Sequence, residues 1–347
     1  MLPIMNSILT QTDDFVGAGS AEVPWPEALR KAVREVEVLA EVLRLPQAWI
    51  DQARRAARQF PLLVPWEFVR RIRPADPHDP LLRQVLPIGD ELIPEPGYSS
   101  DPLGELQRCR APGLLQKYAG RALIVTTGAC AIHCRYCFRR HFPYHDLAAA
   151  RRHWPVILEE LASDASIDEV ILSGGDPLVL PDAWLREWVE ALGRIPHLAR
   201  LRLHTRLPVV IPQRVTQELI DWLRGTRLTP LVVVHVNHPQ ELDETCCTAL
   251  TKLVDSGIPV LNQAVLLRGV NDSADVLEEL CRRLANLRVL PYYLHQLDPV
   301  QGAHHFAVPV QVGIEIVSRL RERLPGYAVP RLVVEEPGQP AKRLLAG

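Results

Sequence analysis

From residue 121 onward, short apolar runs alternate with amphipathic stretches, and this alternation constrains the fold more than any other feature of the chain. Apolar runs rich in β-branched residues predict buried strands, and apolar residues spaced three or four apart predict helices. Repeated units of this kind form parallel sheets with right-handed crossovers. The predicted strands are 122–127, 169–174, 200–205, 231–236, 259–267 and 289–295, and the helices between them include 153–163, 181–193, 212–225 and 272–286.

Six such units predict an open barrel rather than a closed one. A closed eight-fold barrel needs about 250 residues, more than remain after residue 121. We therefore predict an α/β fold with a partial (β/α)6 barrel over residues 111–308, beneath a helical cap over residues 1–110. Residues 309–347 would add a helix (309–324), a strand (329–335) and a short tail. In the cap, residues 1–25 are predicted to be irregular, with helices at 26–45, 49–60, 66–72 and 80–86.

The composition is that of an ordinary soluble globular protein, with 47% hydrophobic and 23% charged residues. A net charge of −2 gives no general attraction to nucleic acid or membrane surfaces. No run reaches the length of a transmembrane helix, and the first residues lack the features of a signal peptide. Seven cysteines, an odd number, do not fit a disulfide framework. We therefore expect a protein of the reducing cytoplasm.

Three cysteines stand in the run CAIHCRYCF, directly after the first predicted strand. Barrels of this class place their chemistry at the C-terminal ends of their strands. Thiolates at C-x3-C-x2-C spacing, here Cys130, Cys134 and Cys137, can bind three irons of a [4Fe–4S] cluster. The fourth iron then has no protein ligand and can bind another molecule, as a catalytic cluster requires.

A structural zinc site is the alternative interpretation of this triplet, with His133, His141 or His145 as the fourth ligand. Structural zinc usually needs a second pair of ligands a dozen or more residues away. The remaining cysteines show no such spacing, and we interpret them as buried or incidental: Cys109, Cys246, Cys247 and Cys281.

A second motif, LSGGDPL, closes the second predicted strand. Gly174 and Gly175 would let a ligand approach the backbone closely, because neither carries a side chain. An ordinary glycine turn is the alternative. Asp176 follows directly and adds a carboxylate at the same strand end.

The cysteine triplet after the first strand of a β/α repeat resembles the radical S-adenosylmethionine (SAM) superfamily. From about residue 80 to the C-terminus the chain further resembles the lysine 2,3-aminomutase family. The segments that carry this resemblance are CRYCFRRHFPY, LSGGDPL, TRLPVVIPQRV, HVNHP, NQAVLLRGVND, PYYLHQLDPVQGAHHF and PGYAVPRLVVEEPG. It implies an isomerase, an intramolecular aminotransferase that uses a [4Fe–4S] cluster, SAM and pyridoxal 5′-phosphate (PLP), with an electron donor such as a flavodoxin or ferredoxin.

The same resemblance implies which residues hold the cofactors. SAM would bind the open iron, and Gly174, Gly175 and Asp176 match the GGE-type motif that contacts its amino group, with aspartate in place of glutamate. Lys342 in EEPGQPAK matches the catalytic lysine that binds PLP, although Gly-Gln-Pro-Ala replaces a run of glycines. Arg121 matches the arginine that binds the PLP phosphate. The alternatives are a solvated terminal lysine and a solvated arginine at a strand end.

Substrate recognition is implied by three further charged residues. Arg139 matches the arginine that binds the substrate carboxylate through a bidentate fork. Asp298 and Glu335 match two carboxylates that face the ε-ammonium of lysine, and such a pair would repel a glutamate side chain. The alternative for Arg139 is a solvated basic loop that it would share with Arg135 and Arg140. Glu336 is expected to face solvent.

The implied reaction converts (S)-α-lysine to (R)-β-lysine. Glu335 in place of aspartate, GQPAK, and the position of Lys342 five residues before the last residue resemble the branch that supplies β-lysine for the modification of translation elongation factor P. There a separate lysyl ligase attaches the product, and weak turnover of free lysine is expected. The alternatives are a catabolic or biosynthetic lysine 2,3-aminomutase, a radical SAM aminomutase for another amino acid, and a zinc-binding protein without enzymatic activity.

Overall fold

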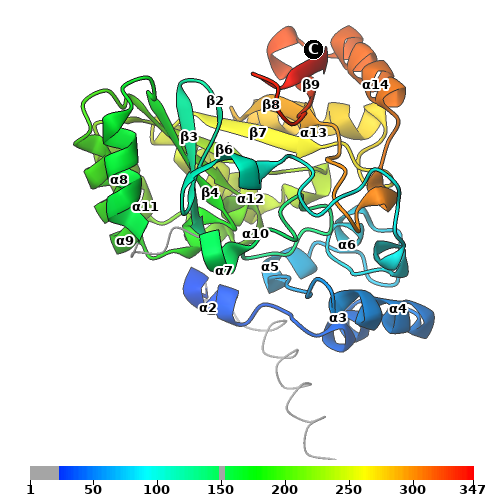
Figure 1. Ribbon diagram of the computed structural model, residues 1–347. Coiled ribbons are helices and arrows are strands. Elements are labelled where there is room, and N and C mark those ends of the chain that lie inside the picture. The colour runs from blue at the N-terminus through cyan, green and yellow to red at the C-terminus, as the bar shows by residue number, and fades with distance from the viewer. Residues whose placement is uncertain (1–22, 148–152) are drawn as a thin grey trace, which may run out of the picture.

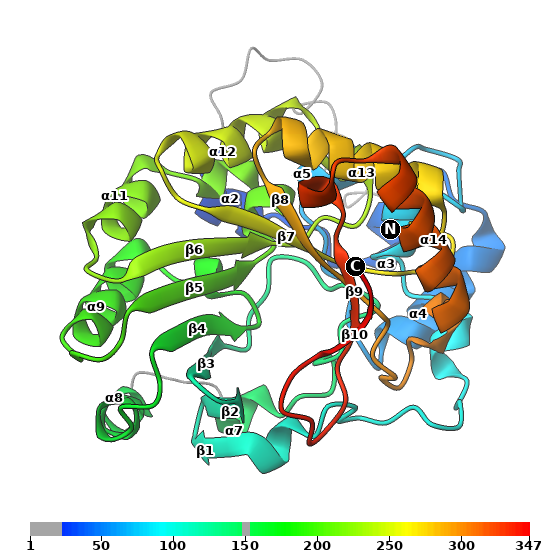
Figure 2. The ribbon, with the colours of Figure 1, turned by 90° about the horizontal axis from the view of Figure 1, so that it is seen from above.

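The computed structural model describes residues 23–147 and 153–347. A ten-stranded sheet follows an open arc in the order β1 to β10 (Figure 2). Strands β3 to β9 are parallel to one another. At one end of the sheet β1 and β2 are added in antiparallel orientation, and at the other end β10 pairs antiparallel with β9. The predicted α/β fold with a partial barrel is therefore confirmed. The strands are β1 Cys109–Ala111, β2 Leu114–Tyr118, β3 Arg121–Thr127, β4 Glu169–Gly174, β5 Arg200–Thr205, β6 Thr229–Val234, β7 Val260–Val265, β8 Leu290–His295, β9 Arg331–Val334 and β10 Arg343–Ala346.

The six strands predicted from apolar runs are β3 to β8, and every boundary agrees within two residues. The strand predicted at 329–335 is β9, which pairs in parallel with β8 and extends the barrel by a seventh parallel strand. Strands β1, β2 and β10 were not predicted, because they are short and carry polar side chains such as those of Arg110, Gln116 and Arg343.

The crossover helices lie on the convex side of the arc, as Figure 2 shows for α8, α9, α11, α12, α13 and α14. Their apolar faces pack on the sheet, and between α8 and α9 the rings of Trp154 and Trp188 stack at 4.6 Å. Along the described ranges no helix is both long and apolar enough to span a membrane. The crossover helices are α8 Trp154–Ser163, α9 Asp182–Gly193, α11 Gln217–Gly225, α12 Glu244–Asp255, α13 Ala274–Asn286 and α14 Val310–Arg323, and two short helices, α7 Tyr144–Leu147 and α10 Leu207–Val210, lie in loops that follow strands.

The N-terminal helices pack against one side of the barrel (Figure 1). The single helix predicted at 26–45 is wrong, because the chain is extended around Val33, which pairs with Val64 through both backbone hydrogen bonds. This pairing splits the segment into α2 and α3. The cap and the barrel share one hydrophobic core. The domain boundaries predicted at residues 110 and 308 remain a prediction, because a shared core marks neither of them. The cap helices are α2 Trp25–Arg30, α3 Val36–Val42, α4 Gln47–Ala57, α5 Trp66–Val69 and α6 Pro80–Arg83.

Candidate functional site

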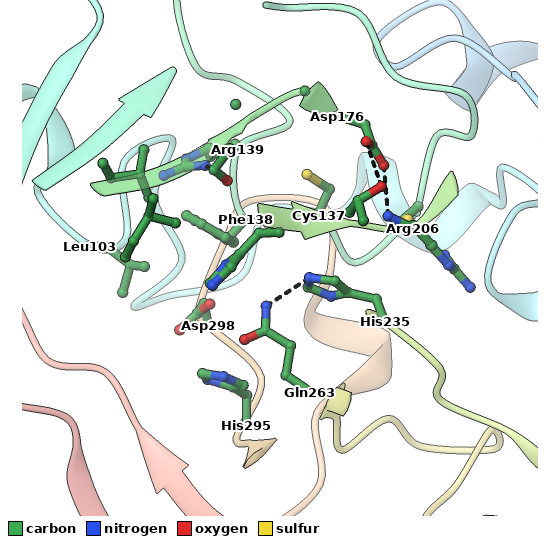
Figure 3. Close-up of a pocket in the computed structure, with 18 of the residues that line it drawn as sticks. Leu103, Cys137, Phe138, Arg139, Asp176, Arg206, His235, Gln263, His295 and Asp298 are labelled. Atoms are coloured by element: carbon green, nitrogen blue, oxygen red, sulfur yellow. Dashed lines mark hydrogen bonds between the residues drawn. The ribbon is translucent and has the colours of Figure 1, made fainter. Parts of the chain in front are cut away.

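A cavity of about 460 Å³ lies within the arc of the sheet (Figure 3). Its lining comes from the strands, from the loop after β3 and from the segment between β9 and β10. The structure brings every site residue predicted from the sequence to this one cavity: Cys130, Cys134, Cys137, Arg121, Gly174, Gly175, Asp176, Arg139, Asp298, Glu335 and Lys342. Their individual roles remain predictions, and the contacts of each residue bear on them.

The two glycines after β4 allow that strand end to approach the start of the cysteine loop. Gly174 has a φ of +118°, and a Cβ added to Gly175 would overlap the carbonyl oxygen of Ala129. The backbone N–H of Gly175 donates to Thr127 O at 2.7 Å. Glycine is therefore needed at this site to hold the loop that carries the cysteines, whether or not a ligand also approaches the backbone.

Gly175→Ala is expected to destabilise the protein by about 3 kcal/mol, because backbone rather than a flexible side chain occupies the space of the new methyl group. Gly225→Ala is the matched control, since nothing lies within 4 Å of the position that its new Cβ would take. Chemical denaturation checks both variants. Equal stability of Gly175→Ala and the wild type would contradict the close approach.

The carboxylate of Asp176 is occupied by internal donors. It accepts hydrogen bonds from Leu178 N at 3.0 Å, Thr205 Oγ1 at 2.7 Å and Arg206 N at 2.7 Å. Burial raises the pKa of Asp176 to about 6. Asp176 thus connects the ends of β4 and β5 beside the cysteine loop, and its contact with SAM remains a prediction.

The three thiols of the loop have the chemistry of a metal-binding set. None forms a disulfide. Desolvation and the neighbouring Cys134 raise the pKa of Cys137 to about 11, and desolvation likewise raises the pKa of Cys130. Such thiols cannot all ionise unless a bound cation compensates their charge, and a metal cluster supplies that charge. The residues therefore fit a cluster bound through Cys130, Cys134 and Cys137.

Two of the three histidines named in the zinc alternative contact the backbone instead. His133 Nδ1 lies 2.9 Å from Pro61 O, and His141 Nε2 lies 3.1 Å from Gln301 O. Within residues 23–147 and 153–347, no three His, Cys, Asp or Glu side chains already converge on one metal position, and this holds for the three cysteines as well as for the histidines. Neither the His133 ring nor the His141 ring, in its present orientation, provides a fourth ligand to a zinc ion bound by the cysteines.

Lys342 and Arg121 lie around one aromatic ring, that of Tyr118. The Arg121 guanidinium is 4.6 Å from the ring centroid, and Lys342 Nζ is 5.9 Å from it. Neither is a freely solvated side chain, since both line the cavity. An amine and a cation on one aromatic platform fit PLP, which needs a lysine for covalent attachment and a cation for its phosphate. Tyr118 was not predicted as a site residue.

A chain of alternating charges crosses the cavity from Arg139 to Lys342. Arg139 donates to both oxygens of Glu105, at 2.6 and 2.8 Å, and Lys117 Nζ lies 3.0 Å from Glu105 Oε1. Lys117 also pairs with Glu335, which in turn pairs with Lys342. Each carboxylate in this chain thus lies between two cations.

These cations set the charge state of the two carboxylates. Burial alone would raise the pKa of Glu105, but Arg139 and Lys117 outweigh it and lower the pKa to about 2. Burial of Glu335 is likewise outweighed by Lys117 and Lys342, which lower its pKa to about 2. No pattern in the sequence pointed to Glu105, and the only signal for Lys117 was that the chain has four lysines.

Asp298 differs from these carboxylates because it forms no ion pair with any of the described residues. Within the described residues, Oδ1 is buried and accepts no hydrogen bond. Burial, followed by the negative charge of Glu335, raises the pKa of Asp298 to about 7. Figure 3 places Asp298 in the cavity together with Arg139. A cationic ligand group would satisfy this carboxylate.

The neighbouring basic side chains of the loop are not solvated, so the alternative interpretation of Arg139 as part of an exposed loop is wrong. Arg135 and Arg140 both pair with the buried Glu91, and their side chains are 0% and 1% exposed. Arg139 itself is buried. Glu336 pairs with Arg343 in a more open position, as expected for a residue facing solvent.

Besides His133, three histidines line the cavity, and none of these three was predicted as a site residue. Burial lowers the pKa of His235 and of His295 to about 3, and it also lowers that of His204, so the rings are neutral. His235 Nε2 lies 2.7 Å from Gln263 Nε2 (Figure 3). The only sequence signal for these histidines was their position in or beside predicted strands. Neutral rings add hydrogen-bonding groups to the cavity without adding charge.

Comparisons with known proteins identify the family of the chain. Residues 124–282 match the family model of the radical SAM superfamily. The chain is 43% identical to the L-lysine 2,3-aminomutase of Haemophilus influenzae, over 94% of this chain and 96% of that protein. It is 44% identical to that of Escherichia coli K12, with coverages of 92% and 93%. The L-lysine 2,3-aminomutase of Clostridium subterminale is 35% identical, with coverages of 90% and 76%.

Proposed function

Because the chain belongs to the L-lysine 2,3-aminomutase family of radical SAM enzymes, we propose that it converts (S)-α-lysine to (R)-β-lysine. The family is one of isomerases that use a [4Fe–4S] cluster, SAM and PLP. The observation that carries the proposed substrate is the unpartnered carboxylate oxygen of Asp298, buried in the same cavity as Lys342 and the three cysteines. A buried anion of this kind matches a substrate with a cationic side chain.

The residues of the cavity divide into groups that would hold each cofactor. Cys130, Cys134 and Cys137 would hold the cluster, and Lys342 and Arg121 would hold PLP at its reactive group and its phosphate. When bound, these groups supply the radical that removes hydrogen from the substrate and the carrier through which nitrogen moves between carbons. The chain holds them within one cavity, whose walls keep water from the reacting atoms.

The charged residues would orient lysine between two ends of the cavity. Asp298 would accept the ε-ammonium, and Arg139 would bind the α-carboxylate with the guanidinium that Glu105 already orients. Glu335 is already paired with Lys117 and Lys342. We therefore assign Asp298 the larger share of the attraction for the ε-ammonium and Glu335 the smaller share.

Binding of the ε-ammonium should strengthen as the pH rises through about 7, the pKa of Asp298. Below that pH the carboxyl is neutral, and above it the carboxylate attracts the cation. 6-Aminohexanoate is the suitable probe, because it has the terminal ammonium and the carboxylate of lysine but no α-amine to titrate. Calorimetry of the full chain at pH 6 and pH 8 should show tighter binding at pH 8, and Asp298→Asn should lose this difference. The same pH dependence in Asp298→Asn would assign it to another group.

The biological role proposed for this activity is the supply of β-lysine for the modification of translation elongation factor P, in the cytoplasm and together with a separate lysyl ligase. The support for this branch is the resemblance described above, which places Glu335 where the free-lysine enzymes usually have aspartate. The chain is 43% and 44% identical to the Haemophilus influenzae and Escherichia coli relatives and 35% identical to the Clostridium relative. An enzyme with high turnover of free lysine would contradict this role but not the chemistry.

The experiment that tests the function is chiral chromatography after anaerobic incubation of the reconstituted protein with L-lysine, SAM, PLP and a reductant. (R)-β-Lysine that forms from wild-type protein and not from Asp298→Asn would support the proposed reaction and its substrate contact. L-Glutamate in place of lysine tests the rival aminomutase. No β-lysine from protein with its cluster and PLP in place would mean that the substrate is wrong.

A further inference from the structure

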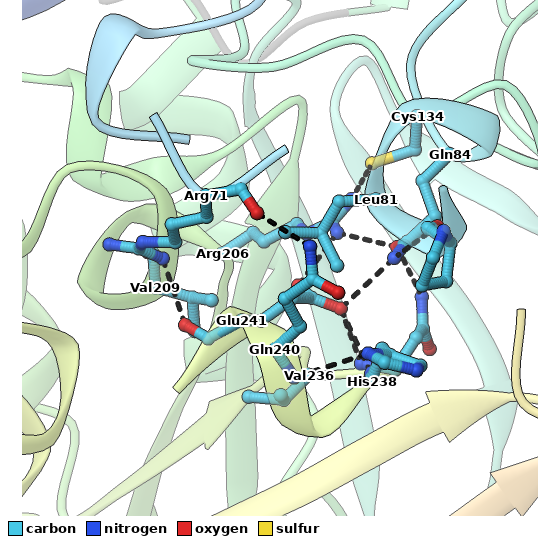
Figure 4. Close-up of polar contacts among 12 residues, drawn as sticks. Arg71, Leu81, Gln84, Cys134, Arg206, Val209, Val236, His238, Gln240 and Glu241 are labelled. Atoms are coloured by element: carbon cyan, nitrogen blue, oxygen red, sulfur yellow. Dashed lines mark hydrogen bonds and ion pairs between the residues drawn. The ribbon is translucent and has the colours of Figure 1, made fainter. Parts of the chain in front are cut away.

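A buried arginine lies directly against one of the three cluster thiols. Arg206 follows β5, its side chain is 7% exposed, and its Nη1 donates to Cys134 Sγ at 2.7 Å (Figure 4). We propose that Arg206 is a positioning residue for the cluster, which fixes the Cys134 thiolate and raises the reduction potential of the cluster through this hydrogen bond. The proposal rests on the cluster assigned to the cysteines and not on the identity of the substrate.

The orientation of the guanidinium is fixed by buried partners on separate elements. Nη2 donates to Gln84 Oε1 at 2.7 Å and to Glu241 Oε2 at 2.9 Å. The backbone N–H of Arg206 donates to Asp176 Oδ2 at 2.7 Å. Gln84 and Glu241 are both 0% exposed. With Nη2 and the backbone held in this way, Nη1 is directed at the sulfur.

Glu241 is itself anchored, so that this network is rigid. Its Oε1 accepts hydrogen bonds from the backbone N–H groups of Asn237 at 2.9 Å and His238 at 3.0 Å. Gln84 Nε2 donates to the same oxygen at 3.1 Å. A side chain held on both faces by buried partners keeps one orientation, which is what a group that positions a ligand requires.

The effect on the cluster follows from charge. Reduction adds an electron to the cluster and its thiolates, and hydrogen bonds to the sulfurs stabilise the reduced, more negative form. A guanidinium is a charge-assisted donor and so a strong one. The charge of Glu241 opposes that of Arg206, and the hydrogen bond to sulfur therefore supplies more of the effect than the net charge does.

The test compares Arg206→Met with Arg214→Met. Arg214 is also fully buried and ion-paired, to Asp182, but it does not line the cavity. The measurement is a redox titration of the reconstituted full chain without SAM or lysine, in which electron paramagnetic resonance detects the reduced cluster at each potential. At a fixed ambient potential the ratio of reduced to oxidised cluster should fall about tenfold in Arg206→Met, a shift of about 59 mV for one electron, and should not change in Arg214→Met.

Each outcome decides the proposal. Arg206→Met with full iron content and the wild-type potential would overturn it. A folded Arg206→Met that cannot hold the cluster, while Arg214→Met can, would support the positioning role. If Arg206→Met does not fold, Glu241→Gln replaces it, because this variant leaves the charge of Arg206 uncancelled. The ratio should then rise, and an unchanged ratio in Glu241→Gln would overturn the proposal. Since no lysine is present, these results do not depend on the proposed substrate.

Discussion

Replacing Lys342 with alanine is expected to abolish covalent attachment of PLP and to lower turnover by about 10³-fold or more. The amine of Lys342 lies in the cavity, paired with Glu335 and close to the ring of Tyr118. The other lysine of the cavity, Lys117, is held between Glu105 and Glu335 and is not placed to replace it. No other described side chain of the cavity offers an amine to the cofactor.

The measurement is borohydride reduction followed by peptide mapping, which locates PLP on the chain independently of activity. Lys31→Ala is the matched control, because Lys31 is exposed and pairs only with Glu27 among the salt bridges of the described residues. PLP should be found on the Lys342 peptide in the wild type and in Lys31→Ala, and on no peptide in Lys342→Ala. Undiminished labelling of Lys342→Ala would place the PLP lysine elsewhere.

Replacing Cys137 with alanine is expected to prevent assembly of the cluster and to reduce the cleavage of SAM to background. The set provides three thiols, so removal of one leaves a second iron without a protein ligand. The substitution shortens a side chain in the cavity wall and leaves the backbone hydrogen bond from Cys137 N to Cys134 O in place. The fold should therefore survive while the cluster is lost.

Iron and sulfide analysis after anaerobic reconstitution checks this expectation, together with the absorbance of the cluster. Cys247→Ala serves as the control, because Cys247 lies half-buried on α12 and does not line the cavity. In the wild type and in Cys247→Ala alike, the amount of iron should nearly equal the amount of sulfide. A colourless wild-type protein with one bound zinc would contradict the cluster and restore the zinc alternative.

The part of the fold that could be predicted from the sequence is the part whose pattern is local. Strand β4 is buried along its whole length, whereas β5 and β7 alternate buried with half-buried residues, and both patterns are visible within a few residues of sequence. The break between α2 and α3 could not be predicted in this way, because it depends on the pairing of Val33 with Val64, thirty-one residues further along. Helical spacing alone does not reveal such a pairing.

The same difference separates the site residues that were predicted from those that were missed. Motifs placed Cys130, Lys342 and Asp298 at the cavity, since each stands in a recognisable run of sequence. Glu105 and Lys117 lie in stretches without a motif, and their importance comes from ion pairs with Arg139 and Glu335 that form only when distant segments meet. Such pairs are properties of the folded cavity and leave no periodic trace in the chain.

The alternating charges between Arg139 and Lys342 make the two ends of the cavity thermodynamically linked. Each carboxylate in this chain lies between two cations, so a change of charge at Arg139 or at Lys342 alters the electrostatic surroundings of the other end. A ligand that binds at one end would therefore change the affinity of the other end for its own ligand, and the effect would be equal in both directions.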